Sequence, residues 1–242
     1  MMRFALLAIG LAIGCTRHGG ATSPAVDAPP QILAALDVQH TPGEQMAWDV
    51  FWQGMAVGHA ELIAGIDDAR ITFRTGTLAS ALASVSYQLA TAIEQGRART
   101  VTEVLTRDGE TRRVEAALGA TSFTLRGVTP RRTPDGQPLH TLASALGVVR
   151  TWSQGTPTQG YLWLIHGGEL YRLDVFPPVR DEALGHHALR IDAVVRASDH
   201  SVTIDLSVWL AANRDRTPLR FVVEEGSDRV SAELVETTGQ LD

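Results

Sequence analysis

The sequence predicts a mostly β protein, with a single antiparallel, strongly curved meander sheet, open or closed like a barrel, and one or two short helices. Three observations support this fold class. Apolar and polar residues alternate from residue 45 onward, turn-forming residues separate the alternating runs, and one segment shows helical periodicity instead. No strong boundary divides these runs, so a single β-rich domain is expected over residues 43–242.

The clearest alternation lies in SVTIDLSVWL, residues 201–210. Its aliphatic residues occupy the even positions from Val202 to Leu210 and predict one buried face, while Trp209 points to the opposite face. The run HALRIDAVVR, residues 187–196, repeats the pattern with aliphatic residues at odd positions. A short polar break at residues 198–200 separates the two runs and predicts a β-hairpin.

Further alternating runs follow one another along the chain, and many are separated by turn residues such as Asp108-Gly109 and Gly167-Gly168. Short strands joined by tight turns are typical of an antiparallel meander. The runs are QMAWDVFWQG, VGHAELIAGI, RITFRTGTL, RARTVTEVLT, TRRVEAALG, TSFTLRG, GYLWLIH, ELYRLDVF, PLRFVVEEG and RVSAELVE.

Helical periodicity is found in PLHTLASALGVVRTW, residues 138–152. Apolar residues recur there at positions 139, 142, 143, 146 and 149, which predicts a helix with one apolar stripe. The segment LASALASVSYQ, residues 78–88, predicts a short helix followed by a strand. The longest loop is expected between residues 127 and 138.

Composition excludes several classes of function. The formal net charge is −6, all 21 basic residues are arginine, and they form no clustered basic face, so nucleic acid is not an expected partner. With one cysteine, neither an intramolecular disulfide nor a Cys-based zinc site is available. No cofactor is expected.

The single cysteine, Cys15, ends a short apolar run that follows Arg3. This run is too short to span a bilayer but has the length of the apolar part of a signal peptide. The tetrapeptide Ala12-Ile13-Gly14-Cys15 resembles a bacterial lipobox, which implies that Cys15 carries a diacylglyceryl group and becomes the new N-terminus. The alternative is an ordinary secretory signal with an incidental cysteine.

The lipobox interpretation divides the chain into three parts. Residues 1–14 are then a lipoprotein signal peptide, and residues 15–42 are a flexible tether, because the stretch after Cys15 is small, polar and rich in proline. The expected partner is a membrane, bound through the lipid on Cys15 on the periplasmic side of a bacterial envelope. Thr16 is not an aspartate, which by resemblance to enterobacterial sorting rules favours the outer membrane.

Four tryptophans are candidate contacts for an apolar ligand or an envelope protein: Trp48, Trp52, Trp163 and Trp209. Trp48 and Trp52 both occupy even positions, so they are expected on the same face of their strand. Trp209 is expected on the face opposite the aliphatic residues of its strand. Aromatic residues off the aliphatic face of a curved sheet can line a cavity. The alternative is that a sheet closing on itself partly buries both faces.

Catalytic and metal-binding motifs are weak or missing in the sequence, so an enzyme is not expected. The adjacent residues His186 and His187 point to opposite faces of a strand and cannot both bind one ion without a bulge. The enzyme alternative requires a dispersed site, in which at least two of His59, His140, His186 and Glu44 converge within about 4 Å.

The order of several segments resembles the bacterial family known as domain of unknown function 3108. The resemblance rests on GEQMAWDVFWQGMAVGHAELI, then ASALASVSYQ, TLASALGVVRTW, VTIDLSVWLAANRDRTPLRFVVEEG and RVSAELVE, and it covers residues 43–236. The segment SVSYQLA departs from the proline-aspartate turn of the family. Membership would imply an exported envelope protein of curved antiparallel β architecture, without a known activity.

Three functional hypotheses remain. The first is a non-enzymatic envelope lipoprotein that binds an apolar ligand or an envelope partner. The second is a structural or assembly protein with a filled barrel, which predicts bulky residues at all inward positions and no ligand. The third is a hydrolase with the dispersed His/Glu site.

Overall fold

The computed structural model describes residues 30–33, 36, 38, 40–81, 83–126, 128–199 and 202–238. The predicted signal peptide and Cys15 lie outside these residues. Across the described ranges, no helix is long and apolar enough to cross a membrane.

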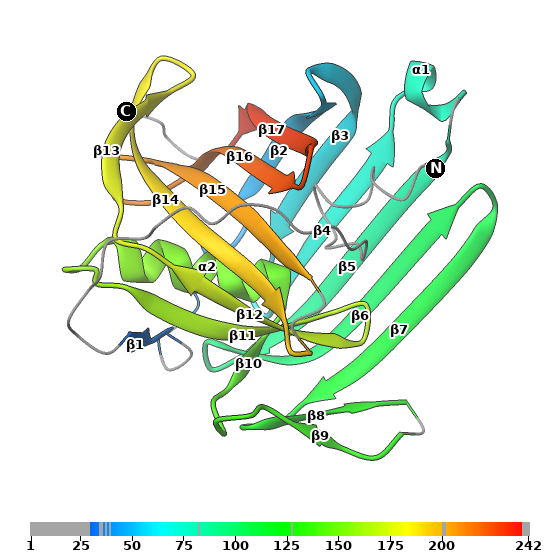
Figure 1. Ribbon diagram of the computed structural model, residues 1–242, viewed down its shortest axis with the longest axis vertical. Coiled ribbons are helices and arrows are strands. Elements are labelled where there is room, and N and C mark those ends of the chain that lie inside the picture. The colour runs from blue at the N-terminus through cyan, green and yellow to red at the C-terminus, as the bar shows by residue number, and fades with distance from the viewer. Residues whose placement is uncertain are drawn as a thin grey trace.

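The fold is mostly β, as predicted, and in the described residues it consists of one large curved sheet with two helices (Figure 1). The sheet has seventeen strands in the order β1-β10-β11-β12-β13-β14-β15-β16-β17-β2-β3-β4-β5-β6-β7-β8-β9. The first series of strands comprises β1 (Gln31–Ile32), β2 (Gln45–Trp52), β3 (Met55–Ala64), β4 (Asp68–Thr75), β5 (Val85–Glu94), β6 (Arg97–Arg107), β7 (Glu110–Leu118), β8 (Ser122–Leu125) and β9 (Arg131–Arg132). The second comprises β10 (Leu139–His140), β11 (Gly160–His166), β12 (Glu169–Val175), β13 (Val179–Ala183), β14 (His186–Ala197), β15 (Thr203–Ala211), β16 (Pro218–Glu225) and β17 (Asp228–Thr237).

Two antiparallel meanders, β2 to β9 and β11 to β17, are joined through the pairing of β17 with β2. In this pairing Leu234 faces Trp48, so strands from the two ends of the described chain meet in the middle of the sheet. The predicted antiparallel arrangement holds throughout both meanders. It does not extend to β1 and β10, which both pair with β11 in parallel.

Among the described strands, no pairing closes the sheet into a barrel. Instead, the turn between β11 and β12 is bonded to strands β6, β7 and β9 by side chains. The Gly167 N–H donates to Glu103 Oε2 at 2.8 Å, Arg112 Nη2 donates to Gly167 O at 2.9 Å, and Arg131 Nη1 donates to Gly168 O at 3.4 Å. These contacts, here called the seam, make the fold barrel-like while the sheet stays open.

The predicted hairpin is formed by β14 and β15, with Ile191 paired to Val208. The alternation of apolar and polar residues in these two strands matches the burial of their side chains. Ile191, Ile204 and Val208 are buried, and Trp209 is half-buried on the other face. Burial of the apolar face fixes the register, because a slip of one residue would expose every aliphatic side chain.

Both predicted helices are present. The longer helix, α2 (Leu142–Ser153), lies inside the curve of the sheet (Figure 1), and α1 (Thr77–Ser80) is followed by β5. The loop expected over residues 127–138 contains a two-residue strand, β9, which pairs with β8. A strand of two residues is too short to show an alternation of apolar and polar residues that could be recognised in the sequence.

The segment before residue 43, expected to be a flexible tether, packs against the domain in its described part. Strand β1 pairs with the first residues of β11, and Leu33 is 0 % exposed. A Cβ atom at Gly160 would lie only 2.8 Å from Leu33 Cδ2, so the glycine leaves the room that Leu33 needs. The folded domain therefore begins before residue 43.

Candidate functional site

The candidate functional site is an apolar cavity between α2 and the concave face of the sheet. The helix contributes one stripe at i, i+3, i+4 and i+7, and alternation of each strand directs one side chain in two to the same space. The cavity has a volume of about 180 Å³ and is partly open. Its lining is Leu142, Ala145, Leu146 and Val149 from α2, with Trp48, Ala60, Leu62, Ile71, Leu164, Leu173, Val195, Ile204, Leu206, Val208, Phe221, Val223 and Ala232 from the sheet.

Every described side chain that lines the cavity is apolar, apart from the indole N–H of Trp48. That group donates to Pro218 O at 3.1 Å, so its hydrogen bond is already made within the protein. The Trp48 ring packs edge-on against Phe221, with centroids 5.7 Å apart. Because no polar side-chain group among these described residues is left to satisfy, the contacts that the walls offer a guest are mainly hydrophobic and dispersion contacts.

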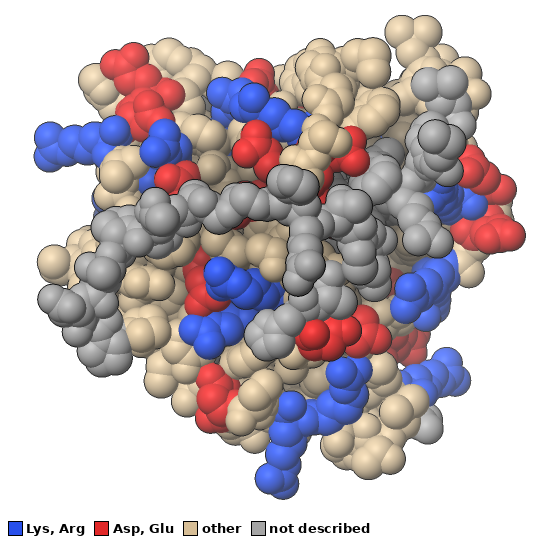
Figure 2. Space-filling model, viewed as in Figure 1, with Lys and Arg blue, Asp and Glu red and all other residues tan. Residues whose placement is uncertain are grey.

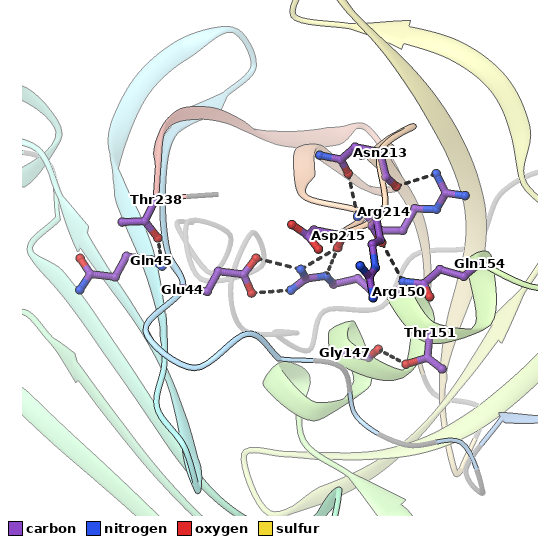
Figure 3. A network of polar contacts seen from close by, with 11 residues as sticks. Glu44, Gln45, Gly147, Arg150, Thr151, Gln154, Asn213, Arg214, Asp215 and Thr238 are labelled. Carbon is purple, nitrogen blue, oxygen red and sulfur yellow. Dashed lines mark hydrogen bonds and ion pairs between the residues drawn. The ribbon is translucent and has the colours of Figure 1, made fainter. Parts of the chain in front are cut away.

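A buried ion pair holds α2 in place on the side of β2 (Figure 3). Arg150 Nη1 donates to Glu44 Oε2 at 2.7 Å, and Nη2 donates to Glu44 Oε1 at 2.8 Å. The two side chains are 1 % and 3 % exposed. Such a bidentate ion pair fixes both the distance between the two side chains and their relative orientation. It therefore sets the position of α2 relative to the start of β2.

The same arginine also ties α2 to the loop between β15 and β16. Arg150 Nε and Nη2 donate to Asp215 O at 2.9 and 2.7 Å, and Gln154 Nε2 donates to Arg214 O at 2.9 Å (Figure 3). The guanidinium is thereby bonded on both sides, which offsets the cost of burying its charge.

The N-terminus of α2 is fixed by hydroxyl groups. Thr141 Oγ1 accepts from the Ser144 N–H and the Ser144 hydroxyl accepts from the Thr141 N–H, which makes a capping box. Thr141 Oγ1 also lies 2.8 Å from Thr91 Oγ1 on β5. Both ends of the helix that covers the cavity are therefore bonded to the sheet or its loops.

His40 lies close to this ion pair, in the segment that leads into β2. Burial and the positive charge of Arg150 lower the pKa of His40 to about 4, against a smaller opposing influence of Glu44. Both ring nitrogens of His40 are buried without a hydrogen-bond partner among the described residues. Protonation of His40 would place a second cation beside Arg150.

We therefore expect acid to destabilise the protein through His40. Its pKa is about 4 in the folded state and 6.5 as the unperturbed value, so the unfolded state binds more protons between these limits. When the pH is lowered from about 7 to 5, the free energy of unfolding, measured with urea, should fall in both proteins. The fall should be about 1–2 kcal/mol smaller in His40→Gln than in the wild type. The exposed residue His187 gives the matched control, His187→Gln, which should fall as the wild type does. An identical pH dependence in His40→Gln and the wild type would contradict this assignment.

The four tryptophans singled out in the sequence lie in different places. Trp48 lines the cavity, whereas the other three are not among its lining residues. Trp163 Nε1 donates to Asp135 at 2.8 Å, and Trp209 Nε1 donates to Asp181 at 3.0 Å. Trp52 is half-buried and packs against the core.

The residues of the dispersed His/Glu hypothesis are found on separate elements. Glu44 binds Arg150, and His59 Nδ1 lies 3.2 Å from Asp49 Oδ1 on the neighbouring strand. His140 is buried on β10, and His186 begins β14. Within the described part of the chain, no group of three or more His, Cys, Asp or Glu is placed to hold a metal ion.

A second polar cluster, at the seam, was not indicated by any pattern in the sequence. His166 Nδ1 lies 3.1 Å from Glu103 Oε2 and 3.3 Å from the Tyr87 hydroxyl. Burial, followed by the charge of Glu103 and a hydrogen bond to it, raises the pKa of Tyr87 well above its usual value. Burial likewise raises the pKa of Tyr171, whose ring is tilted against that of His166 with centroids 6.4 Å apart, to about 12. Both phenols therefore stay protonated, and the cluster serves to join β5, β6 and β11.

Comparisons with known proteins identify the fold. No protein-family model matches the chain, and no curated protein matches it in sequence. The chain is similar to a solved β-barrel-like protein of domain of unknown function DUF1849 from Brucella abortus, with a TM-score of 0.57 and 10 % identity over 81 % of this chain and 97 % of that one.

A weaker similarity links the chain to a solved structure from Bacteroides fragilis, described as an exported protein with a YmcC-like fold. The TM-score is 0.33 at 10 % identity, over 84 % of this chain and 99 % of that one. The stronger match shows the architecture alone: the chain adopts the fold of a bacterial β-barrel-like domain of unknown function.

Proposed function

We propose that this protein is a non-enzymatic bacterial envelope lipoprotein whose β domain binds an apolar ligand. The cavity under α2 is the observation that carries the proposal, since its lining is apolar throughout and it is partly open. Binding sites for apolar molecules are typically preformed concavities of this character. A filled barrel would instead need bulky side chains at all inward positions, whereas Ala60, Ala145 and Ala232 line the space.

The location is proposed from the N-terminal sequence. A lipid on Cys15 would hold the domain at the periplasmic side of the envelope, with the outer membrane as the favoured membrane. The resemblance to domain of unknown function 3108 agrees with such a location. The B. abortus structure supports the architecture of the domain, and the location depends on the lipobox-like tetrapeptide.

The test of ligand binding is native mass spectrometry of the full chain carrying Cys15→Ser, purified without detergent. We expect a bound mass on the order of several hundred daltons that leaves on organic extraction, because a hydrophobe in an apolar cavity dissociates slowly into water. If the bare chain mass persists after incubation with an envelope lipid extract, ligand binding is refuted.

Lipid anchoring has its own test. The full chain produced in a bacterium should sediment with the membrane fraction, and Cys15→Ser should release most of it into the periplasmic extract, because no acyl chains remain to insert. The substitution Thr16→Ser, next to the modified position, is the control and should leave the protein in membranes. A Cys15→Ser protein that still sediments firmly with membranes rules out the lipoprotein interpretation.

A further inference from the structure

We infer that the cavity takes the end of a single unbranched hydrocarbon chain, about seven carbons long, and leaves the polar group of the molecule outside. This inference rests on the proposed function and specifies its ligand as an alkyl or acyl chain. The volume of the cavity, the extent of its lining and the chemistry of its walls point to such a chain.

The volume limits how much hydrocarbon can enter. A dry apolar cavity of roughly 150 Å³ accommodates benzene, which has six carbons. On that scale the cavity of about 180 Å³ holds about seven carbons. It is smaller than the roughly 300 Å³ at which pockets begin to enclose drug-sized molecules, so a sterol or another fused-ring system does not fit.

The lining is extended along α2. Leu142 and Val149, at the two ends of the helix stripe, are seven residues apart, which corresponds to about 10 Å along the helix axis. A straight chain of seven carbons, with six zigzag bonds of about 1.5 Å, is about 8 Å long between its end carbons and covers most of this stripe. A compact cage or ring of the same carbon number would leave part of the stripe uncovered.

The chemistry of the walls excludes polar groups from the interior. The only polar side-chain atom among the described lining residues, Trp48 Nε1, already donates to Pro218 O. The charged atoms of Arg150, next to Val149 on the helix, are bonded to Glu44 and Asp215. A hydroxyl, carboxylate or ester inside the cavity would be desolvated without a partner, so these groups stay at the opening.

Isothermal titration of the full chain carrying Cys15→Ser with 1-alkanols of increasing length tests the inference. We expect binding to tighten about fourfold for each added methylene up to about seven carbons, and then by less than twofold for each further methylene. The compact ten-carbon alcohol 1-adamantanol should bind at least tenfold more weakly than 1-heptanol. Heptanoate and 1-heptanoyl-lysophosphatidylcholine, measured alongside, identify the source of the chain as a free acid or a lipid, according to which binds more tightly.

The outcomes separate this inference from the proposed function. If 1-adamantanol binds as tightly as 1-heptanol, or if affinity does not depend on chain length, the single-chain inference is wrong while ligand binding stands. If no alcohol of either shape binds and no mass is retained in the native spectrum, the proposed function fails with it.

Discussion

Replacing Glu44 with alanine should lower the free energy of unfolding by about 3–5 kcal/mol. The substitution leaves the Arg150 guanidinium buried, since its side chain is 1 % exposed, and bonded among the described residues only to Asp215 O. An uncompensated buried charge costs far more than the loss of an exposed pair. Urea unfolding monitored by circular dichroism measures the change, and the midpoint of the transition should move to much lower urea.

Glu233 offers a matched control for this substitution. It pairs with Arg220 at 3.4 Å between two strands, but both side chains are about one-third exposed, so Glu233→Ala should cost less than about 1 kcal/mol. The double variant Glu44→Leu/Arg150→Met, which removes both charges, should recover part of the stability lost in Glu44→Ala. Equal losses in Glu44→Ala and Glu233→Ala would show that the buried pair does not fix α2.

Filling the cavity with Ala145→Phe should abolish ligand binding, with at least a tenfold loss of affinity for 1-heptanol. Ala145 is 4 % exposed and lines the cavity from α2. The added phenyl ring is about the size of benzene and would occupy most of the 180 Å³. Because the ring enters existing space, the free energy of unfolding should stay within about 2 kcal/mol of the wild type. Isothermal titration and urea unfolding of the same preparation measure the two effects.

Two further variants make this result interpretable. Ala232→Phe fills the same cavity from β17 and should also abolish binding, so the conclusion does not depend on how well α2 tolerates a larger residue. Ala117→Phe, at an exposed position of β7, should bind as the wild type does. If both filling variants fold and still bind 1-heptanol with unchanged affinity, the ligand site lies elsewhere.

Local patterns in the sequence predicted the strands and helices well, because apolar residues recur with a characteristic period within each strand or helix. The β14–β15 hairpin and the stripe of α2 are examples. The pairing of β17 with β2 was not foreseen, since it depends on which apolar edges meet after the whole chain has folded. The side-chain closure at Gly167 likewise depends on Arg112 and Glu103, which lie on distant strands.

Much of the candidate site could not be read from the sequence for a related reason. Arg150 follows the apolar stripe of α2, where an arginine is ordinarily solvated, and nothing near it in sequence marks Glu44 as its partner. The tryptophans were singled out as a group, yet Trp48 alone among them reaches the cavity lining. Small residues such as Ala145 and Ala232, which create the space, carry no distinctive pattern.

The pairing of β2 with β17 also determines when the domain can fold. On a ribosome or in a translocation channel, β2 emerges long before β17, and until then one edge of β2 has no partner. The contact is strongly non-local, so the loop-closure entropy must be overcome before the middle of the sheet forms, and folding is expected to be slow. A chain that completes its sheet only after its last strand has emerged stays unfolded long enough to be threaded across a membrane, in keeping with the proposed place of this protein in the cell envelope.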